Sequence, residues 1–398
     1  MNKIIELFGE LFSYNKLALI LVLVEMTKAV GFMSTLPDYL IYGFLLIFAL
    51  NNYRYKHRLE PLFVLILAYI PIELILSQPD PLFRSWARYI GFVLAFLAFS
   101  PLIQGQRARI MRKEALMCLS IISTVLSVIS FFCYFLGINF MRAGMDVLVY
   151  SAGVFGGLFR QSMLLGPIAG FASIYTSYLA YSKKERVFWV LSIMCIGAVL
   201  FSASRSALMA TFAGNVVLLY KASRGNGKFL KSIMIITLLA SITFPLWESV
   251  TDLVIEKQAN NTASGNIFMS REQKWMNRIN EIKSSPLFGV GFAAVDTNSV
   301  GDYSAHNGQI EPGTSWLSIL SMLGLFGALI IMPIFITCYK YCNKMLNEID
   351  ALYMGFLVFF AVHLNAEGYI FSSGGFLFFM LWLTVGVAFD QKYEIKNS

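Results

Sequence analysis

Residues 107–138, RARIMRKEALMCLSIISTVLSVISFFCYFLGI, place a cluster of positive charges directly before a long run of apolar side chains. The apolar run from 115 to 138 is long enough to cross about 30 Å of hydrocarbon as a helix that rises about 1.5 Å per residue. Lys and Arg concentrate in the cytoplasmic loops of membrane proteins. The stretch therefore predicts a transmembrane helix that begins on the cytoplasmic side.

Similar apolar runs recur along the chain of 398 residues, which is 57% apolar and 14% charged and has a mean hydropathy of +0.66. A water-soluble protein of this composition would lack polar surface, so the bilayer is the expected solvent. The sequence predicts about twelve transmembrane helices. Their expected ranges are 17–33, 38–52, 61–77, 87–103, 115–138, 163–181, 187–203, 206–221, 229–248, 314–338, 350–366 and 373–390.

Basic residues occur in every connection that would be cytoplasmic if both termini are cytoplasmic. They are Lys3, Lys16, Arg54, Lys56, Arg58, Arg107, Arg109, Arg112, Lys113, Lys183, Lys184, Arg186, Lys221, Arg224, Lys228, Lys231, Lys340, Lys344, Lys392 and Lys396. The net charge of +8 therefore indicates topology and not a nucleic-acid surface. The predicted fold is an all-α polytopic membrane protein, a single domain over 1–398. It has one large periplasmic loop, 249–313, between helices 9 and 10.

The five cysteines lie in or beside apolar runs, and no pair has the spacing of a metal or redox motif. They are Cys118, Cys133, Cys195, Cys338 and Cys342. We expect buried thiols, no metal site and no cofactor.

Arg205 lies in a short connection between two apolar runs at the predicted outer surface. Its planar guanidinium suits a diphosphate, because it can donate two parallel hydrogen bonds to phosphate oxygens. The alternative is an interfacial arginine that reaches lipid phosphates. An anionic lipid-linked substrate would also explain why further arginines lie on this side. These are Arg84, Arg88, Arg142 and Arg160.

The large loop contains a predicted helix that starts with a capping box of Ser270 and Gln273 and runs to about Lys283. Its positive side chains share one face, and an apolar stripe lies beside that face. The first set is Arg271, Lys274 and Arg278, and the second is Trp275, Ile279 and Ile282. The cations would face an anionic substrate while the stripe packs on the bundle. The alternative is an amphipathic helix on anionic lipid.

Among the three histidines, His306 in the large loop is the candidate general base, because imidazole takes up a proton near neutral pH. The alternative is an exposed loop histidine. His363 lies within an apolar run, where a helix-packing role is expected. Glu25 and Lys28 are spaced to pair, whereas Glu73 has no evident partner. A proton pathway through these acidic groups would support a transporter.

The ordered set of these residues resembles the O-antigen ligase and polymerase superfamily of bacterial inner-membrane glycosyltransferases. The resemblance covers residues 164–329, and its motifs are Ser202–Ala207, Arg271 with Trp275, Ser285–Gly291, His306 with Asn307, and Leu320–Gly327. The two glycines of Pro286–Gly291 permit a tight turn but form no phosphate-loop signature.

The resemblance implies transfer of an undecaprenyl-diphosphate-linked glycan to an acceptor glycan at the periplasmic face of the inner membrane, without a metal. It implies that Arg205 and Arg271 bind the diphosphate and that His306 activates the acceptor hydroxyl. We add Arg278 to the diphosphate-binding set. His306 lies farther from the next span than the family pattern has it, so Glu311 is a rival base. The candidate substrate contacts are Arg160, Lys274 and Asn307.

Three functions are compatible with this sequence. A polymerase joins repeat units to one another, and the displaced His-Asn register favours this function. A ligase transfers the finished glycan to lipid A core. A flippase or other transporter of twelve helices would share the topology, but it would be expected to place polar residues near the midplane of both halves.

Overall fold

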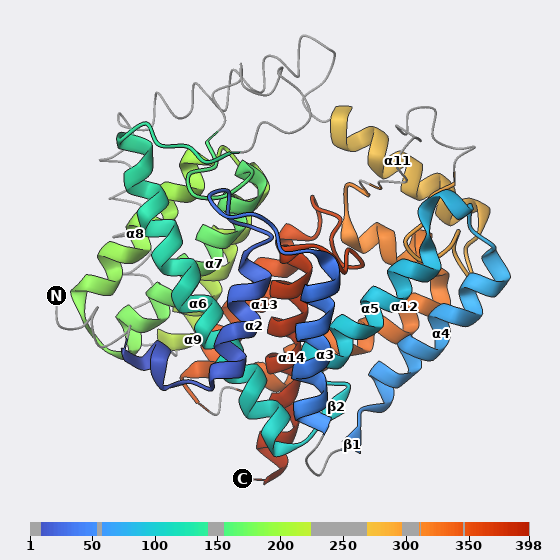
Figure 1. The fold of residues 1–398 in the computed structure, drawn as a ribbon, viewed down its shortest axis with the longest axis horizontal. Coiled ribbons are helices and arrows are strands. Elements are labelled where there is room, and N and C mark those ends of the chain that lie inside the picture. Colours follow the sequence, from blue (N-terminus) through green and yellow to red (C-terminus); the bar gives the residue numbers. More distant parts are fainter. Residues whose placement is uncertain are drawn as a thin grey trace.

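A computed structural model describes residues 9–53, 58–141, 155–223, 269–296, 310, 312–344 and 347–397. The described chain is mostly helical (Figure 1). The first helices are α2 (Lys16–Met26), α3 (Asp38–Tyr53), α4 (Pro61–Ser77), α5 (Ser85–Phe99), α6 (Gln106–Phe135), α7 (Ser162–Ser182), α8 (Arg186–Phe201) and α9 (Arg205–Ser223). The later helices are α11 (Met269–Ser284), α12 (Ser315–Cys342), α13 (Ile349–His363) and α14 (Phe376–Asn397). The short elements are the 3-10 helix η1 (Pro81–Phe83) and the antiparallel strands β1 (Arg58–Leu59) and β2 (Ile103–Gln104).

Every predicted span except 229–248, which lies outside the described residues, contains a helix. Within the described part of the chain, four helical segments are long and apolar enough to cross a bilayer, namely Pro81–Phe99, Gln106–Phe135, Ser162–Ser182 and Ser315–Cys342. Three further apolar helices are shorter, namely Pro61–Ser77, Arg186–Phe201 and Ile349–His363. The helical membrane-protein class is confirmed, and the count of about twelve spans stays a prediction.

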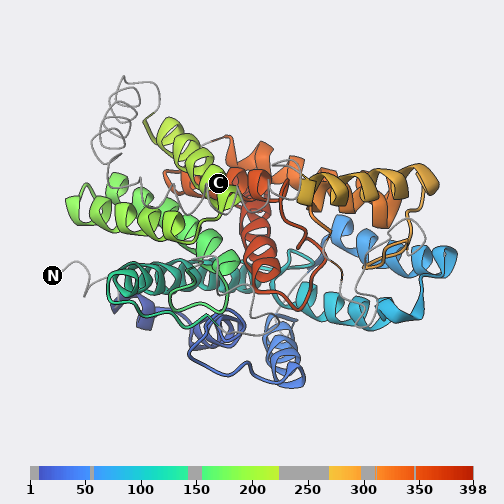
Figure 2. The same cartoon turned by 90° about the horizontal axis from the view of Figure 1, so that it is seen from above.

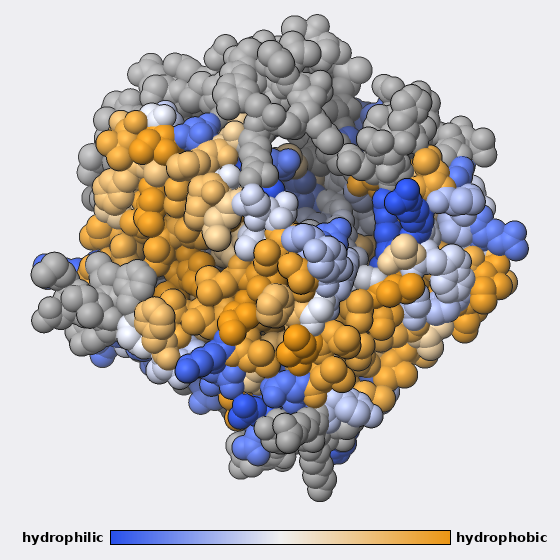
Figure 3. Space-filling view, viewed as in Figure 1, coloured by the Kyte–Doolittle hydropathy of each residue, from blue (hydrophilic) through white to orange (hydrophobic). Residues whose placement is uncertain are grey.

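Large apolar side chains cover much of the outside of the bundle. Ile75, Phe212 and Leu329, from three different helices, are each more than half exposed. A broad hydrophobic band crosses the visible face, with hydrophilic residues gathered below it (Figure 3). An exposed apolar surface of this extent is unfavourable in water and favourable against lipid tails.

Helix α14 runs through the centre of the bundle, with α7, α8 and α9 on one side and α4, α5, α11 and α12 on the other (Figure 2). It packs against α12, α6, α13, α5 and α2. Trp382 on α14 is fully buried; its ring centroid lies 4.6 Å from that of Phe96, and its indole Nε1 donates to the carbonyl oxygen of Ile370 at 3.0 Å. The main core of the protein is therefore built around α14.

A buried ion pair joins α6 to α14 near the connections predicted to be cytoplasmic. The Arg112 guanidinium donates to both carboxylate oxygens of Asp390 at 2.8 and 2.9 Å, and to the carbonyl oxygens of Ser100 and Ile103 at 3.1 Å. Arg112 is only 1% exposed, although the sequence placed it among the charges of a cytoplasmic loop. The carboxylate and the carbonyls together replace the water that this guanidinium loses on burial.

At the other end of the bundle, α2 ends at Met26, well before the predicted end of the span at residue 33. The Arg160 guanidinium donates to the carbonyl oxygens of Thr27, Val30 and Met33 at 2.8–2.9 Å. An arginine outside the segment thus satisfies the backbone groups that a helix would otherwise satisfy. Val30 also bridges to Phe159, so two connections predicted to be periplasmic lie together. The assignment of this end to the periplasm stays a prediction.

Candidate functional site

The connection that carries Arg205 is a tight turn between α8 and α9. Ala203 adopts a left-handed conformation at φ 50°, and the buried Ser202 hydroxyl donates to the carbonyl oxygen of Val199 at 2.6 Å. A Cβ added at Gly166 of α7 would lie 2.8 Å from the Ser202 hydroxyl oxygen. The small residues of the turn therefore let it pack directly on the glycine of α7.

This packing leaves Arg205 exposed as the first residue of α9. The first turn of α9 contains no acidic residue, so the positive end of the helix dipole adds to the charge of the guanidinium. Backbone N–H groups at a helix start and a planar arginine both favour phosphate oxygens. The location agrees with the sequence prediction of an accessible anion-binding arginine, whose binding role stays a prediction.

Helix α11 presents a different face to the bundle from the one that the sequence predicts. Arg278 is completely buried and pairs with Glu281, with Nη2 and Oε1 2.7 Å apart. Trp275, Ile279 and Ile282, the expected packing stripe, are only half-buried. The predicted exposure of Arg278 is therefore wrong, because the carboxylate one turn later neutralises it and lets the pair face inward. A diphosphate-binding role for Arg278 stays a prediction that requires this pair to open.

The other two cations of the predicted set on α11 are Lys274 and Arg271. Lys274 is half-buried, and its Cβ is the nearest atom to where a side chain on Gly313 would start. Arg271 belongs to α11, and its side chain lies outside the described residues. The described part of α11 thus presents Lys274, next to the chain that leads into α12, as a candidate substrate contact.

Glu281 links α11 to the chain that follows it. Its Oε1 also accepts a hydrogen bond from the Asp296 amide at 3.0 Å. Burial raises the pKa of the Glu281 carboxyl to about 7, although the charge of Arg278 acts in the opposite direction. Because the whole side chain is buried, the group positions the chain after α11 and does not contact solvent directly.

The segment Pro286–Gly291 is interlocked with α12 through backbone hydrogen bonds. The amides of Val290 and Gly291 donate to the carbonyl oxygens of Ser321 and Met322 at 2.8 and 3.2 Å. In return, the amide of Leu325 donates to the carbonyl oxygen of Pro286 at 2.9 Å. We call this paired arrangement of residues 286–291 with 321–326 the backbone clasp.

Glycines make the backbone clasp possible. The helical pattern of α12 breaks at Gly324, where φ is 64°, and Gly289 on the opposing segment has φ 84°. A side chain on either glycine would collide with the backbone of the other segment. Glycine is the residue that allows both the left-handed conformation and this close approach. The glycine motif therefore has a structural role, in agreement with its lack of a phosphate-loop signature.

Residues of α4 and α5 hold the outer side of the clasp. The Glu73 carboxylate accepts from the Phe292 amide at 2.9 Å, and the Tyr69 hydroxyl donates to the carbonyl oxygen of Leu323 at 2.7 Å. Arg88 donates to the carbonyl oxygen of Ala293 at 3.1 Å. Glu73 thus has the partner that the sequence did not reveal. These contacts account for its burial without a proton pathway.

The predicted pair of Glu25 and Lys28 is confirmed, with 2.8 Å between Lys28 Nζ and Glu25 Oε2. His363 is buried as expected, and its Nδ1 lies 2.9 Å from the Tyr369 hydroxyl. All five cysteines are buried and free of disulfides, as predicted. In the described part of the chain, no three His, Cys, Asp or Glu side chains gather as a metal site would require.

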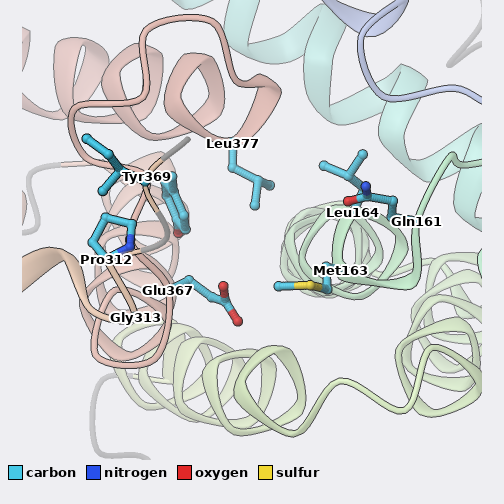
Figure 4. Close-up of a pocket in the computed structure, with 10 residues that line it drawn as sticks. Gln161, Met163, Leu164, Pro312, Gly313, Glu367, Tyr369 and Leu377 are labelled. Carbon is cyan, nitrogen blue, oxygen red and sulfur yellow. The ribbon is translucent and has the colours of Figure 1, made fainter. Parts of the chain in front are cut away.

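A cavity of about 180 Å³ lies between the start of α7 and the connection from α13 to α14. The residues that line it are Gln161, Met163, Leu164, Ile310, Pro312, Gly313, Glu367, Gly368, Tyr369 and Leu377. The Glu367 carboxylate and the Met163 side chain point toward each other across the hollow (Figure 4). Tyr369, Pro312 and Gly313 form one side, and Gln161 and Leu164 form the other.

One serine holds the Glu367 side of the cavity in place. The Ser315 hydroxyl, at the start of α12, donates to the carbonyl oxygen of Glu367 at 2.6 Å. The Ser315 hydroxyl oxygen in turn accepts from the amides of Tyr369 and Ile370 at 3.1 and 3.3 Å. Gly368 fits against Pro312, where a Cβ would lie 2.6 Å from the proline ring. The start of α12 and residues 367–370 thus form one unit.

The sequence-predicted residues meet this cavity at its edges. Arg160, whose guanidinium holds the carbonyls of the α2–α3 connection, directly precedes the lining residue Gln161. The predicted bases His306 and Glu311, and Asn307 beside His306, lie outside the described residues. Ile310 and Pro312, which flank Glu311 in the sequence, both line the cavity. Gly166, on which the Arg205 turn packs, follows Leu164 of the lining within one helical turn.

Sequence reasoning did not identify Glu367 or Tyr369 as site residues. The available signal was the polar stretch Asn365–Tyr369 between two apolar runs on the predicted outer side. Spatial proximity to Gln161, about two hundred positions earlier in the chain, only became visible in the fold.

Comparison with known proteins gives one family. A search of curated proteins finds no match to this chain. Residues 189–332 match a family model described as O-Antigen ligase, and this stretch runs from α8 to the second half of α12. It includes Arg205, α11 and the backbone clasp. The match supports, over residues 189–332, the resemblance to the O-antigen ligase and polymerase superfamily that the sequence shows.

Proposed function

We propose that the protein is a glycosyltransferase of the bacterial inner membrane that works at the periplasmic face on an undecaprenyl-diphosphate-linked glycan. Its proposed activity is polymerisation of O-antigen or capsular repeat units. The observation that carries the proposal is the exposed Arg205 at the start of α9, inside the family match. Its turn packs on Gly166 of α7, two residues after Leu164, which lines a cavity with polar and apolar walls.

The chemistry follows from what the substrate must do. The acceptor hydroxyl oxygen attacks the anomeric carbon of the donor sugar, and the bond from that carbon to the diphosphate oxygen breaks. Undecaprenyl diphosphate leaves with the electron pair, and a base takes the hydroxyl proton. Arg205 and Arg271 stabilise the charge that develops on the departing diphosphate. In this scheme the arginines provide the charge stabilisation, and we assign no metal ion to it.

The base in this scheme is His306, with Glu311 as its rival. We expect His306→Ala to abolish turnover while donor binding persists, because a general base acts on the acceptor hydroxyl and not on the diphosphate. Donor binding would be measured with purified protein and glycolipid. Unchanged turnover in His306→Ala, with loss of turnover in Glu311→Gln, would transfer the role to Glu311.

The alternative within the superfamily is a ligase that transfers finished glycan to lipid A core, and the description of the matching family favours it. The alternative of another class is a flippase or other transporter. Its best sequence support came from Glu25 and Glu73, which the fold instead engages with Lys28 and with the Phe292 amide. Both acidic groups therefore have contacts that need no proton pathway.

Deletion of the gene, followed by gel analysis of the surface glycan, separates the three functions. The proposal expects glycolipid that carries a single repeat unit. Lipid-linked chains that are not attached to lipid A would indicate a ligase, and glycan confined to the cytoplasmic leaflet would indicate a flippase. Either result would overturn the polymerase assignment.

A further inference from the structure

The cavity between α7 and residues 367–369 has the chemistry of a sugar-binding pocket. Its lining combines a carboxylate from Glu367 and an amide from Gln161 with the aromatic ring of Tyr369 and several aliphatic side chains. A sugar ring presents hydroxyl groups at its edge and C–H groups on its faces. Carboxylate and amide oxygens accept hydrogen bonds from hydroxyls, and apolar walls accept the C–H faces.

The size of the cavity favours one ring. A protein cavity of roughly 150 Å³ accommodates benzene, so about 180 Å³ has room for a single six-membered ring. Ligand pockets for larger molecules start at roughly 300 Å³. The cavity therefore has room for about one residue of a longer saccharide.

The walls are held rigidly, as a specific pocket requires. The Tyr369 ring is fixed at its hydroxyl by His363, and the backbone of Glu367 and Tyr369 is fixed by the Ser315 hydroxyl. Burial raises the pKa of the Tyr369 hydroxyl well above its ordinary value, so this group stays protonated and the wall carries no charge of its own at neutral pH. Glu367, which is half-buried, supplies the carboxyl group of the pocket.

We propose that this cavity is a saccharide subsite in which Glu367 and Gln161 bind the hydroxyls of one sugar ring and Tyr369 packs against it. The proposal rests on the proposed function, because that reaction needs a sugar hydroxyl near a lipid-linked sugar. Ile310, Pro312 and Gly313 line the pocket, and they lie in the sequence at the end of the loop that contains both candidate bases. The pocket is also within one helical turn of α7 from Gly166, on which the Arg205 turn packs. The ring belongs either to the acceptor or to the donor glycan.

Two variants test the subsite by independent means. Glu367→Gln keeps the shape of the side chain and removes its acidic group. Met163→Trp places a larger side chain in the cavity, at a position where the native methionine is 45% exposed. The matched controls are Glu272→Gln, an exposed carboxylate on α11, and Met209→Trp, a 66% exposed methionine on α9. If Glu367→Gln fails to give monodisperse protein, Met163→Trp carries the test alone.

The first measurement is binding to the purified full-length protein in detergent. The probe is the repeat-unit oligosaccharide, which is released by mild acid from the glycolipid of the same strain. Its binding is measured by saturation-transfer NMR. We expect wild type and both controls to bind it, and Glu367→Gln and Met163→Trp to weaken binding at least roughly tenfold, as loss of a hydrogen bond to a charged group does. Wild-type-like binding by both cavity variants would overturn the subsite.

The second measurement is transfer, with the KM of donor and acceptor determined separately. A rise in the acceptor KM alone places the acceptor ring in the cavity, and a rise in the donor KM alone places the donor ring there. Unchanged KM values for both substrates contradict the subsite even if the protein transfers glycan. If wild type transfers nothing but binds the oligosaccharide in a Met163-dependent way, the subsite stands and the proposed transfer reaction fails.

Discussion

The amide of Phe326 donates a hydrogen bond to the carbonyl oxygen of Leu287 at 3.2 Å, just beyond the break in α12 at Gly324. A broken helix leaves backbone groups without intrahelical partners, and hydrocarbon offers them none. Here the segment after α11 supplies those partners, so the irregular backbone is tolerated because it lies within protein. The backbone clasp therefore joins the chain between α11 and α12 to the core of the bundle.

Replacement of Gly324 tests this dependence. In Gly324→Ala the new methyl group would overlap the carbonyl group of Leu287, and alanine at φ 64° and ψ −168° adds a cost of roughly 1–3 kcal/mol. We expect the melting temperature of the purified protein to fall by several degrees or more. The control is Gly374→Ala, because a Cβ at Gly374 meets no atom within 4 Å. Equal melting of Gly324→Ala and wild type would show that the clasp does not constrain α12.

Arg205 is predicted to be needed for transfer and not for folding. Loss of one charge-stabilising donor raises the barrier by a few kcal/mol, so we expect Arg205→Ala to reduce glycan transfer at least about a hundredfold. Arg186 offers a matched control, because it is also an exposed arginine at the first position of an apolar helix but lies at the other end of α8. Glycan length and the rate of glycan transfer would be compared between deletion strains complemented with wild type, Arg205→Ala or the Arg186→Ala control. Near-normal transfer by Arg205→Ala would remove the guanidinium from the reaction.

The pair of Arg112 and Asp390 is predicted to be costly to break. In Asp390→Asn the buried guanidinium loses its counter-charge, which typically costs about 3–5 kcal/mol. Replacement of both partners by apolar residues, Arg112→Met with Asp390→Leu, should cost less than the sum of the single changes. The melting temperatures of the detergent-extracted single and double variants measure these costs. Glu10→Gln, which breaks the exposed pair with Lys183, should cost at most about 1 kcal/mol. Additive single changes would argue against a coupled pair.

Glu281 is predicted to make stability depend on pH. The folded carboxyl has a pKa of about 7 against an ordinary value of 4.5, so the folded state binds more protons than the unfolded state between these values. This contribution to stability is fully present below pH 4.5 and is lost as pH rises through 7. We expect the melting temperature of wild type, measured relative to Glu281→Gln, to fall between pH 5 and pH 8.

The matched control for the pH experiment is Glu272→Gln, since Glu272 is exposed on the same helix. Its melting temperature relative to wild type should change little over this range. A constant difference between wild type and Glu281→Gln from about pH 5 to about pH 8 would mean that the Glu281 carboxyl does not titrate there.

The predicted orientation is open to cysteine labelling. The five native cysteines are buried, so single replacements in a cysteine-free background report position. An impermeant maleimide applied to cells with a permeabilised outer membrane should label Glu272→Cys and spare Lys184→Cys, both of which replace exposed residues. Melting of each variant would show that it is folded. Labelling of Lys184→Cys alone would place the Arg205 turn in the cytosol and remove the basis of the proposed glycan transfer.

Hydropathy predicted where the helices lie, because apolar length is a local property of the sequence. It misplaced the end of α2, since the carbonyls of Thr27, Val30 and Met33 are satisfied by Arg160, far away in the chain. Residue spacing likewise paired Glu25 with Lys28 correctly. It could not show that Arg278 turns inward with Glu281, because helical periodicity gives neighbours on a helix and not the surface that the helix packs against.

The candidate site was predictable only in part, for the same reason. Arg205 stands at a junction of two apolar runs and was recognisable from that position. The cavity joins Gln161 to Glu367 and Tyr369 through the packing of α7 against α13, and no motif encodes such a contact. The backbone clasp depends on main-chain hydrogen bonds, of which the glycines were the only visible sign.

The central place of α14 has a consequence for biosynthesis. This helix leaves the ribosome after all the other described helices, yet α2, α5, α6, α12 and α13 all pack against it. Until residues 376–391 have been inserted, the earlier helices surround an unfilled interior. Arg112 also lacks its ion-pair partner Asp390 until then. Assembly in the membrane therefore finishes only with this late step, so prematurely terminated chains would present unfinished surfaces to quality-control proteases.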